Sequence, residues 1–485
     1  MKQLWLCLYL PQLALNVHTR TNLQQTPLVI FEGQGNQQTI ISGNPAARLS
    51  GITPGMRLSA AYALTGELVV RERNPLAEQQ ALEHLAIWAG QFTSWIQVKP
   101  PYTLLLEIQG SLRLFDGLSV LLNKIQQGVT ELGYDAQHAL AQTPAAAELL
   151  ARDGQEYAIL HEHQLNAAVS KVAVHHLEVN NKTIDQFHGL GLRYVRDLLR
   201  LPRDGLTKRF GAEFVNYLDR LLGHAPDPRP SFRAPEYFRS RVEITFPVDK
   251  TEPLLFIGKR LLLELVGFLR SRGAGTQQLI WTLYHEKKAR THFELNLVEP
   301  SRDAAHLFDL LRERLERLSL VAPVFEVGLR VRNVQSLEER NEQLIQNDKE
   351  QKHEDWQQLV ERLTARMGEE SVSGIRMIAD HRPEKSWRYC VPGESGPQAE
   401  FENRPLWLME APQKLEIRNR KLFRNGYLEL LTGPERIQCG WWDSDRKNNQ
   451  DIQRDYFIAK NTQGQRYWIF REIGENEKWF VHGVF

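Results

Sequence analysis

The sequence contains little cysteine and lacks a long apolar run. Its 485 residues include three cysteines, Cys7, Cys390 and Cys439. They are odd in number and far apart, so they predict neither a disulfide framework nor a metal-ligand spacing, which favours a reducing compartment. No stretch reaches the roughly 18 apolar residues that a membrane-spanning helix needs. These absences favour a cytoplasmic protein that does not cross a membrane.

Bulk composition excludes little else. A hydrophobic fraction of 42% and a charged fraction of 25% are typical of globular proteins. At 485 residues the chain is too long for one hydrophobic core, so we expect several domains. The net charge of +1 conceals regional differences and says little about partners until the chain is divided.

Acidic residues are nearly missing from two predicted strands. Residues 4–10 and 102–108 are short apolar runs, and they predict buried strands that pair with each other. Helical patterns lie between and after them, which is typical of a mixed sheet covered by helices. Glu107 is the only acid in either run, and Asp116 follows it nearby. A displaced acidic pair of Glu107 and Asp116 therefore remains an alternative metal site.

A Gly-hydrophobic-Gly turn predicts contact with a nucleic-acid backbone. Residues 184–192 pass through Gly189 and Gly191 into another apolar stretch, as in a helix–hairpin–helix. Such a turn permits close approach and aims backbone amides at a phosphate. The basic side chains on this segment, which suit a DNA backbone, are Arg193, Arg196, Lys208 and Arg209. A plain two-helix turn with a glycine cap is the alternative.

Residues 236–335 predict a β-α-β-β-α-β domain with many cations. Strands are expected at 241–248, 277–284, 292–298 and 324–331, with helices at 253–272 and 304–318. The candidate phosphate-contacting residues are Arg239, Arg241, Lys259, Arg260, Arg270, Arg272, Lys287, Lys288 and Arg290. Solubilising surface charge is the alternative explanation for them.

The last third of the chain changes composition twice. Residues 336–355 are rich in Glu, Gln, Asn and Lys and predict a flexible or solvated helical linker, followed by a short helix at 356–367. Tryptophan then becomes frequent, and short aromatic runs predict a small antiparallel sheet. Aromatic anchors dominate interface energies, so we expect Trp407, Trp441 and Trp442 to form a partner-binding surface.

This layout resembles the catalytic core of Y-family translesion DNA polymerases. In that family the two strands carry the carboxylates that hold two Mg²⁺ ions. Tyr9 and Pro11 stand at the metal-binding positions of the first strand, and Tyr102 and Thr103 at those of the second. A nucleotide-contacting motif survives only in part, as residues 44–48. Because these side chains cannot replace carboxylate oxygens on Mg²⁺, the resemblance implies a polymerase fold without catalysis.

The resemblance also implies a domain plan for this α+β multidomain chain. The palm is expected at 1–18 and 75–165, the fingers at 19–74, the helix–hairpin–helix thumb at 166–228, and the little finger at 236–335. A charged linker with a short helix at 336–379 would lead to a C-terminal partner-binding module at 380–485.

Further motifs resemble the ImuB family, the Y-family-like members of bacterial mutasome cassettes, over essentially the whole chain. They lie at residues 4–13, 189–193, 198–203, 380–384, 404–408 and 433–442. The resemblance implies a cofactor-free adaptor that binds DNA in SOS-type, damage-induced mutagenesis. Its implied partners are the RecA-like ImuA, the error-prone C-family polymerase ImuC and the sliding clamp.

The expected clamp-binding peptide is degenerate. Its two candidates, Gln343-Leu344-Ile345 and Gln358-Leu359-Val360, lack a following aromatic anchor. Two rival functions also remain: an active polymerase that uses Glu107 and Asp116, and a protein adaptor whose core no longer binds DNA.

Overall fold

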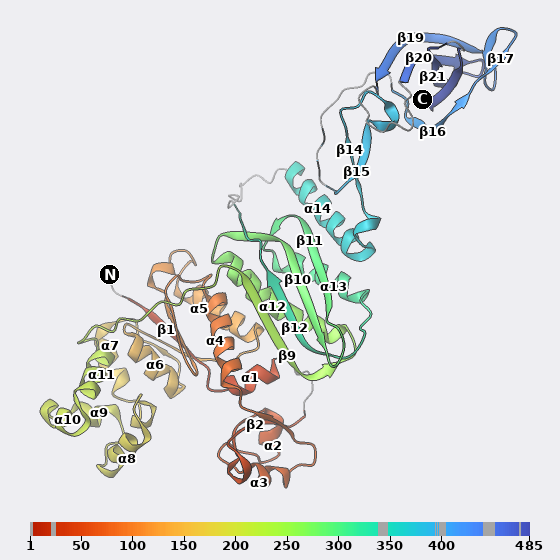
Figure 1. Cartoon of the computed structure of the whole chain (residues 1–485). Helices are drawn as coiled ribbons and strands as arrows, with labels where there is room; N and C mark the ends of the chain where they lie inside the picture. The colour runs from red at the N-terminus through yellow and green to blue at the C-terminus, as the bar shows by residue number, and fades with distance from the viewer. Residues whose placement is uncertain are drawn as a thin grey trace. The chain divides into compact units, whose positions relative to one another are not determined.

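The computed structural model describes residues 3–20, 26–337, 348–392, 394, 396, 404–439, 452–474 and 477–485. The chain divides into two compact units, residues 1–366 and residues 367–485. Figure 1 shows both units, and each is described by itself below. Among the described residues, no helix combines the length and the hydrophobicity that crossing a bilayer requires.

The two acid-poor runs pair as predicted. β1 (Trp5–Tyr9) lies antiparallel to β6 (Thr103–Glu107), with Trp5 opposite Glu107 and Tyr9 opposite Thr103. They are central in the sheet β5-β6-β1-β7-β8. The other strands are β5 (Ile96–Lys99), β7 (Gln137–Ala141) and β8 (Tyr157–Ala158).

Helices cover both faces of this first sheet. Successive residues of a strand point to opposite sides, so the same strand contacts helices on both faces. Leu6 and Leu8 pack against α4 (Pro75–Ala89) and α5 (Leu118–Glu131). Trp5 and Cys7 pack on the other face, against α6 (Pro144–Asp153). The sheet is therefore buried on both sides, and this explains why its central strands are almost wholly apolar.

A small sheet is inserted between β1 and β6. β2 (Leu28–Glu32) pairs antiparallel with β3 (Thr39–Gly43) and parallel with β4 (Val69–Glu72). Two short helices, α2 (Pro45–Leu49) and α3 (Leu58–Tyr62), pack on it around Val29 and Ile40. α1 (Leu13–Thr19), which the sequence pattern did not predict, connects β1 to this insertion.

Short helices extend the α6 side of the first sheet. They are α7 (Glu162–Val169), α8 (Asn181–Gly189), α9 (Val195–Leu199), α10 (Arg203–Phe210) and α11 (Ala212–Leu222). Phe187, Phe210 and Phe214 meet with ring centroids 5.0–5.7 Å apart and hold α8, α10 and α11 together. The same hydrophobic core includes Leu149 of α6, so these helices are packed directly onto the first domain.

The predicted β-α-β-β-α-β order is confirmed in the second half of unit 1. The elements are β9 (Phe238–Val248), α12 (Glu252–Arg270), β10 (Ala274–His285), β11 (Thr291–Ser301), α13 (Ala304–Glu316) and β12 (Val324–Val331). The antiparallel sheet has the order β11-β10-β12-β9, and the short β13 (Gln335–Ser336) also pairs with β10. α12 and α13 cover one face of it (Figure 1) and share a core with its buried side chains.

Helix α14 (Asp348–Met367) begins earlier than the predicted short helix. It is not solvated on all sides, because Val360 and Glu361 are buried. The Glu361 carboxylate accepts a 2.6 Å hydrogen bond from the amide of Val298 on β11 and pairs with His306 of α13. This part of the predicted linker is therefore attached to the sheet of unit 1.

Unit 2 contains the predicted small antiparallel sheet. Its strands are β16 (Trp407–Lys414), β19 (Leu428–Cys439), β20 (Ile452–Asn461), β21 (Arg466–Glu472) and β22 (Trp479–Val484), in the order β16-β22-β21-β20-β19. Two ribbons accompany it: β14 (Gly374–Met377) with β15 (Trp387–Cys390), and β17 (Glu416–Arg418) with β18 (Lys421–Phe423). Tyr456, Trp468 and Phe470 are buried in its core.

Candidate functional site

Two tyrosines lie at neighbouring strand ends, at positions where the resemblance predicts carboxylates to be missing. Tyr9 ends β1, where it is paired with Thr103, and Tyr102 precedes β6 opposite Leu10. The amide of Leu10 donates to the carbonyl of Tyr102 at 2.8 Å, and the two rings meet edge to face with centroids 6.2 Å apart. Thr103, beside Tyr102, is 2% exposed. The strand ends thus present aromatic rings and a buried hydroxyl.

Guanidinium groups flank these rings. Arg73 donates to the Tyr102 hydroxyl at 3.1 Å and to the buried carboxylate of Glu78 at 2.8 Å. Arg152 of α6 lies 6.0 Å from the centre of the Tyr9 ring. Burial raises the pKa of both Tyr9 and Tyr102, so both phenols stay neutral at pH 7. Within the described ranges, no group of three or more His, Cys, Asp or Glu side chains is arranged to hold a metal ion.

Glu107 lies at the opposite end of these strands. It is paired with Trp5, four residues of strand or about 13 Å from the Tyr9–Thr103 pair. Its carboxylate accepts the amides of Leu4 and Gln109, both at 3.2 Å. Asp116 is exposed in the following turn, with φ of 55°. These two acids therefore lie away from the strand ends that the resemblance identifies.

The predicted phosphate-binding turn already uses its amides. Gly191 has φ of +74°, as a tight glycine turn requires. Its amide donates to His188, and the Leu192 amide donates to Phe187. The Asp197 carboxylate accepts from the amides of Tyr194 and Arg193 at 3.0 and 3.1 Å, and these bonds lower the pKa of Asp197. A phosphate at Gly189–Gly191 would therefore compete with internal hydrogen bonds, and the Asp197 carboxylate lies at the following helix start.

The basic side chains around this turn are exposed. Arg193 lies in the turn, and Lys208 and Arg209 lie in the last turn of α10. Arg196 stacks its guanidinium 4.4 Å from the ring of Tyr194. These side chains remain candidates for phosphate contact.

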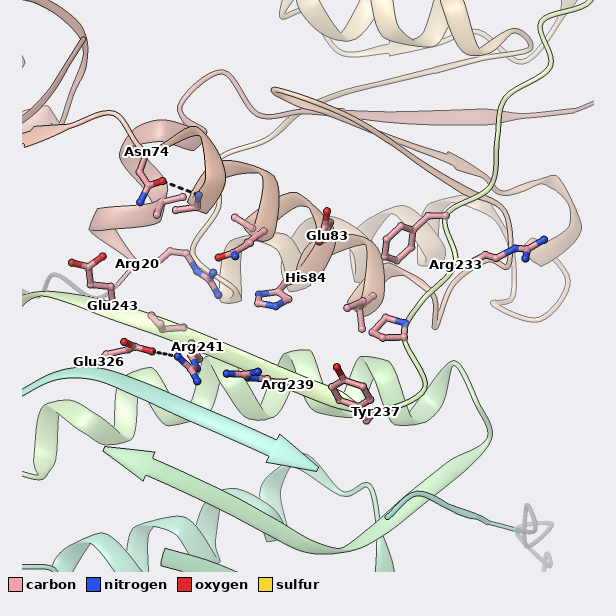
Figure 2. Close-up of a pocket in the computed structure, with 18 residues that line it drawn as sticks. Arg20, Asn74, Glu83, His84, Arg233, Tyr237, Arg239, Arg241, Glu243 and Glu326 are labelled. Carbon is pink, nitrogen blue, oxygen red and sulfur yellow. Dashed lines mark hydrogen bonds and ion pairs between the residues drawn. The ribbon is translucent and has the colours of Figure 1, made fainter. Parts of the chain in front are cut away.

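A polar cleft of about 900 Å³ lies between α4 and β9. Figure 2 shows Arg239 and Arg241 on β9, with Glu83 and His84 across from them on α4 and Arg233 on the preceding segment. Exposed Arg239 and Arg241 alternate with buried Phe238, Ser240 and Val242, which places both cations on the face of the sheet opposite to α12.

Arg241 contacts other side chains on this open face of the sheet. Its guanidinium is 3.5 Å from the Glu326 carboxylate and 5.0 Å from the centre of the Tyr284 ring. Lys287 and Lys288 are exposed in the turn between β10 and β11. Arg290, in the same turn, has its guanidinium 4.8 Å from the centre of the Tyr284 ring. The open sheet face and this turn thus hold five of the predicted phosphate-contacting residues.

The remaining predicted cations lie on the other side of the same sheet. Arg260 of α12 rests against the backbone of the first domain, with Nε 3.4 Å from the Glu131 carbonyl, and burial lowers its pKa to about 10. Arg270 donates to Gln91, and Arg272 donates to the Pro235 carbonyl at 2.5 Å. Lys259 is exposed on the same helix. The predicted cations of α12 and β9 therefore lie on opposite sides of one sheet.

A buried ion pair that sequence reasoning missed joins the two halves of unit 1. Arg20, which follows α1, donates to Glu264 of α12 at 2.5 Å, to the Tyr134 hydroxyl at 2.5 Å and to the Leu132 carbonyl at 2.8 Å. Ser240 of β9 donates to the second oxygen of Glu264 at 2.7 Å. In the sequence, Arg20 and Glu264 differ in no way from the many charged residues that are exposed. Their charge alone therefore could not predict that they form a buried pair.

Unit 2 presents apolar side chains to solvent. Trp407 is 72% exposed and the adjacent Leu406 is 94% exposed. Trp441 and Trp442 lie outside the described residues. By contrast, Trp468 is buried and stacks on Tyr456 at 4.1 Å, so tryptophans of this unit serve different roles.

The clamp-peptide candidates differ in their surroundings. Gln358-Leu359-Val360 lies inside α14, where Val360 is buried, and so it is not presented as an extended peptide. Gln343-Leu344-Ile345 lies outside the described residues.

Comparison with known protein families identifies the class of protein that this chain resembles. Residues 10–152 match the impB/mucB/samB family. This stretch begins directly after β1 and includes the inserted sheet, β6 and all but the last residue of α6. With the confirmed element order, it supports the predicted fold class: an α+β chain with a Y-family polymerase-like core, followed by an all-β C-terminal module.

The particular relatives are proteins named ImuB. The chain is 28% identical to Protein ImuB of Caulobacter vibrioides strain NA1000 / CB15N over 90% of this chain and 100% of that protein. The same values hold for strain ATCC 19089 / CIP 103742 / CB 15. The resemblance to ImuB predicted from the motifs is confirmed.

Solved structures give weaker similarities. The insertion ternary complex of Dbh DNA polymerase is 15% identical with a TM-score of 0.41, and covers 69% of this chain and 100% of that chain. DinB from Sulfolobus solfataricus is 14% identical with a TM-score of 0.39, and covers the same shares.

Proposed function

We propose that this protein is a polymerase-like adaptor that binds DNA without extending it. It would recruit an error-prone polymerase during translesion synthesis and damage-induced mutagenesis. The observation that carries the proposal is the pair of neutral phenols, Tyr9 and Tyr102, at the strand ends. Two-metal phosphoryl transfer needs several oxygen ligands with negative charge, and neutral phenols beside guanidinium groups do not supply them.

Primer extension tests the loss of catalysis. The full chain is incubated with primer-template DNA, all four nucleotides and either Mg²⁺ or Mn²⁺, and no extension is expected. Tyr9→Asp should also be inactive, because one added carboxylate does not complete a two-metal site. Templated extension that disappears in Glu107→Gln or Asp116→Asn would establish the rival, an active polymerase with displaced carboxylates.

DNA binding is proposed for the open face of the second sheet and for the thumb-like helices. Arg239 and Arg241, with the turn lysines Lys287 and Lys288, would contact phosphates rather than base edges, so binding would not depend on sequence. Arg193, Lys208 and Arg209 would add contacts from the helices. The cations of α12 are left out because they lie on the other side of the sheet, where Arg260 and Arg270 contact the first domain.

A matched pair of variants tests this face. On duplex DNA each phosphate contact contributes roughly −0.9 to the slope of log affinity against log salt. Arg239→Gln with Arg241→Gln should make the slope about 1.8 less negative. Lys259→Gln with Arg270→Gln removes the same charge from the opposite side and should leave the slope unchanged. Equal effects from both variants would mean that the open face is not the binding surface.

Recruitment is proposed for unit 2. Its partners would be a RecA-like protein of the ImuA type and a C-family polymerase of the ImuC type, with the sliding clamp as a further candidate. Exposed Trp407 is the proposed anchor, since a solvent-exposed tryptophan offers a large apolar contact area. If the full chain captures both partners but binds no DNA, the pure protein adaptor is the correct function.

A further inference from the structure

The ribbon β17–β18 in unit 2 ends in an unusual turn. Arg418 and Lys421 are directly paired, so Asn419 and Arg420 alone form the turn. Both have positive φ, 50° and 59° respectively. Two such residues make the tight turn that suits a twisted ribbon, and Asn-Gly is the favoured pair for it. Arginine therefore stands where glycine would relieve the backbone, and it is exposed at the tip.

Cations from two further connections, β18–β19 and β20–β21, add to those of this ribbon. The turn between β20 and β21 contributes Lys460 and Arg466, which are paired with each other. This turn lies beside the connection between β18 and β19, because Asn461 donates to the carbonyl of Asn425 at 3.3 Å and the Arg424 guanidinium lies 5.5 Å from the Tyr467 ring. The same connection meets the tip, where the Asn419 amide group donates to the Tyr427 hydroxyl at 3.3 Å. We call this group the hairpin patch; its members are Arg418, Arg420, Lys421, Arg424, Lys460 and Arg466. Figure 1 marks the ribbon by the label β17.

Acidic side chains offset only part of this charge. Glu416 pairs with Arg418 at 2.7 Å, and Glu429 is paired with Lys460 across the strands. Two of the six cations thus lie opposite a carboxylate in these pairings between described residues, in a chain whose net charge is +1. Such local excess is the electrostatic signature of a surface that binds a polyanion.

Aromatic rings lie among the cations. Phe423 and Tyr427 meet edge to face at 5.5 Å, and the Arg418 guanidinium lies 4.0 Å from the Phe423 ring. Tyr427 is 40% exposed, and its hydroxyl accepts from the Asn419 amide group at 3.3 Å. Cations alternating with accessible rings suit single-stranded nucleic acid, whose phosphates and bases need both kinds of contact.

We propose that the hairpin patch is a nucleic-acid-binding surface of unit 2, separate from the surfaces proposed for unit 1. It would contact the phosphates of a single strand through the tip cations, with Tyr427 available for base stacking. Recognition would be independent of sequence, because the exposed groups reach phosphates and base faces rather than base edges. This goes beyond the proposed adaptor role, in which unit 2 binds only proteins.

The test uses the full chain and a fluorescent single-stranded oligonucleotide, with affinity measured by anisotropy over a series of salt concentrations. Arg420→Gly with Lys421→Gln removes two tip charges, and Gly fits the positive φ at position 420. On single strands each contact contributes roughly −0.7 to the slope, so the slope should become about 1.4 less negative. The unfolding midpoint of the variant should equal or exceed that of the parent protein.

The control removes two exposed cations of unit 2 that lie outside the patch, Arg388→Gln with Lys478→Gln, and should leave the slope unchanged. Lys460→Gln with Arg466→Gln repeats the test from the second turn, and covers the case in which the tip variant fails to fold. An unchanged slope in both patch variants would overturn the inference. So would loss of binding to an acidic peptide without any loss of binding to the oligonucleotide.

These outcomes are independent of the DNA surface proposed for unit 1. If only the patch variants change the slope, unit 2 binds the strand and the open sheet face does not. If only Arg239→Gln with Arg241→Gln changes it, the hairpin patch is wrong and the proposed function is retained.

Discussion

Removing the carboxylate of Glu264 should destabilise unit 1 far more than removing a surface carboxylate. The side chains of Arg20 and Glu264 are 6% and 2% exposed. In Glu264→Ala the Arg20 guanidinium keeps the Leu132 carbonyl and the Tyr134 hydroxyl but loses its counter-ion. Leaving one partner of a buried pair uncompensated costs about 3–5 kcal/mol. We expect a loss in this range.

A double-mutant cycle separates the pair from its surroundings. Arg20→Met with Glu264→Leu removes both charges and keeps apolar volume, so it should recover much of the loss, with a coupling energy of about 2–3 kcal/mol. Recovery should be incomplete, because Ser240 and Tyr134 lose their partners. The free energy of unfolding is measured in urea, and the fluorescence of the full chain is read alongside circular dichroism.

The pH dependence has a defined sign. Burial alone would raise the pKa of Glu264, but Arg20 lowers it below its ordinary value. Because the folded pKa is lowered, the stabilisation is present above the unfolded pKa of about 4.3 and is lost as the pH falls through the folded value.

The control is Asp309→Ala, which breaks an exposed pair with Arg312 on α13 and should cost at most about 1 kcal/mol. If Glu264→Ala costs no more than Asp309→Ala, or if the double variant is as unstable as the sum of the single variants, the reasoning is refuted.

Three further predictions concern packing, pH and the surface of unit 2. Gly267→Ala should destabilise unit 1 by about 1–3 kcal/mol in urea unfolding, because the added Cβ would lie 2.9 Å from Trp88 Cα; Gly205→Ala, with open space around it, should not destabilise. Burial lowers the pKa of His482 to about 4, so unit 2 should lose up to about 3 kcal/mol of unfolding free energy as the pH falls from about 6.5 to 4. His482→Phe should remove that pH dependence in fluorescence-monitored unfolding, and an unchanged dependence would contradict the assignment. Trp407→Ala should weaken partner capture in a pull-down while changing stability by less than about 0.5 kcal/mol; a collapse of the folded signal would instead show that Trp407 is needed for packing.

Much of the fold follows from local patterns in the sequence. The apolar run around β1, the run at β6 and the β-α-β-β-α-β order are set by side-chain periodicity, which acts between residues two to four positions apart. The missing carboxylates at Tyr9, Pro11, Tyr102 and Thr103 can likewise be read without a structure. Sequence alone therefore determined the fold class and showed that the strand ends lack carboxylates.

The tertiary structure decided which groups are free and which face they share. Gly191 lies in the expected tight turn, but only the folded chain brings the Asp197 carboxylate to the neighbouring amides. Arg241 and Arg270 are equally basic in sequence, yet the α12 and β9 sides of one sheet separate them. Glu107 lies at the far strand end because β1 and β6 are antiparallel. Arg20 and Glu264 are 244 residues apart, and a pair so distant has no local pattern, because its geometry exists only after both halves of unit 1 have packed.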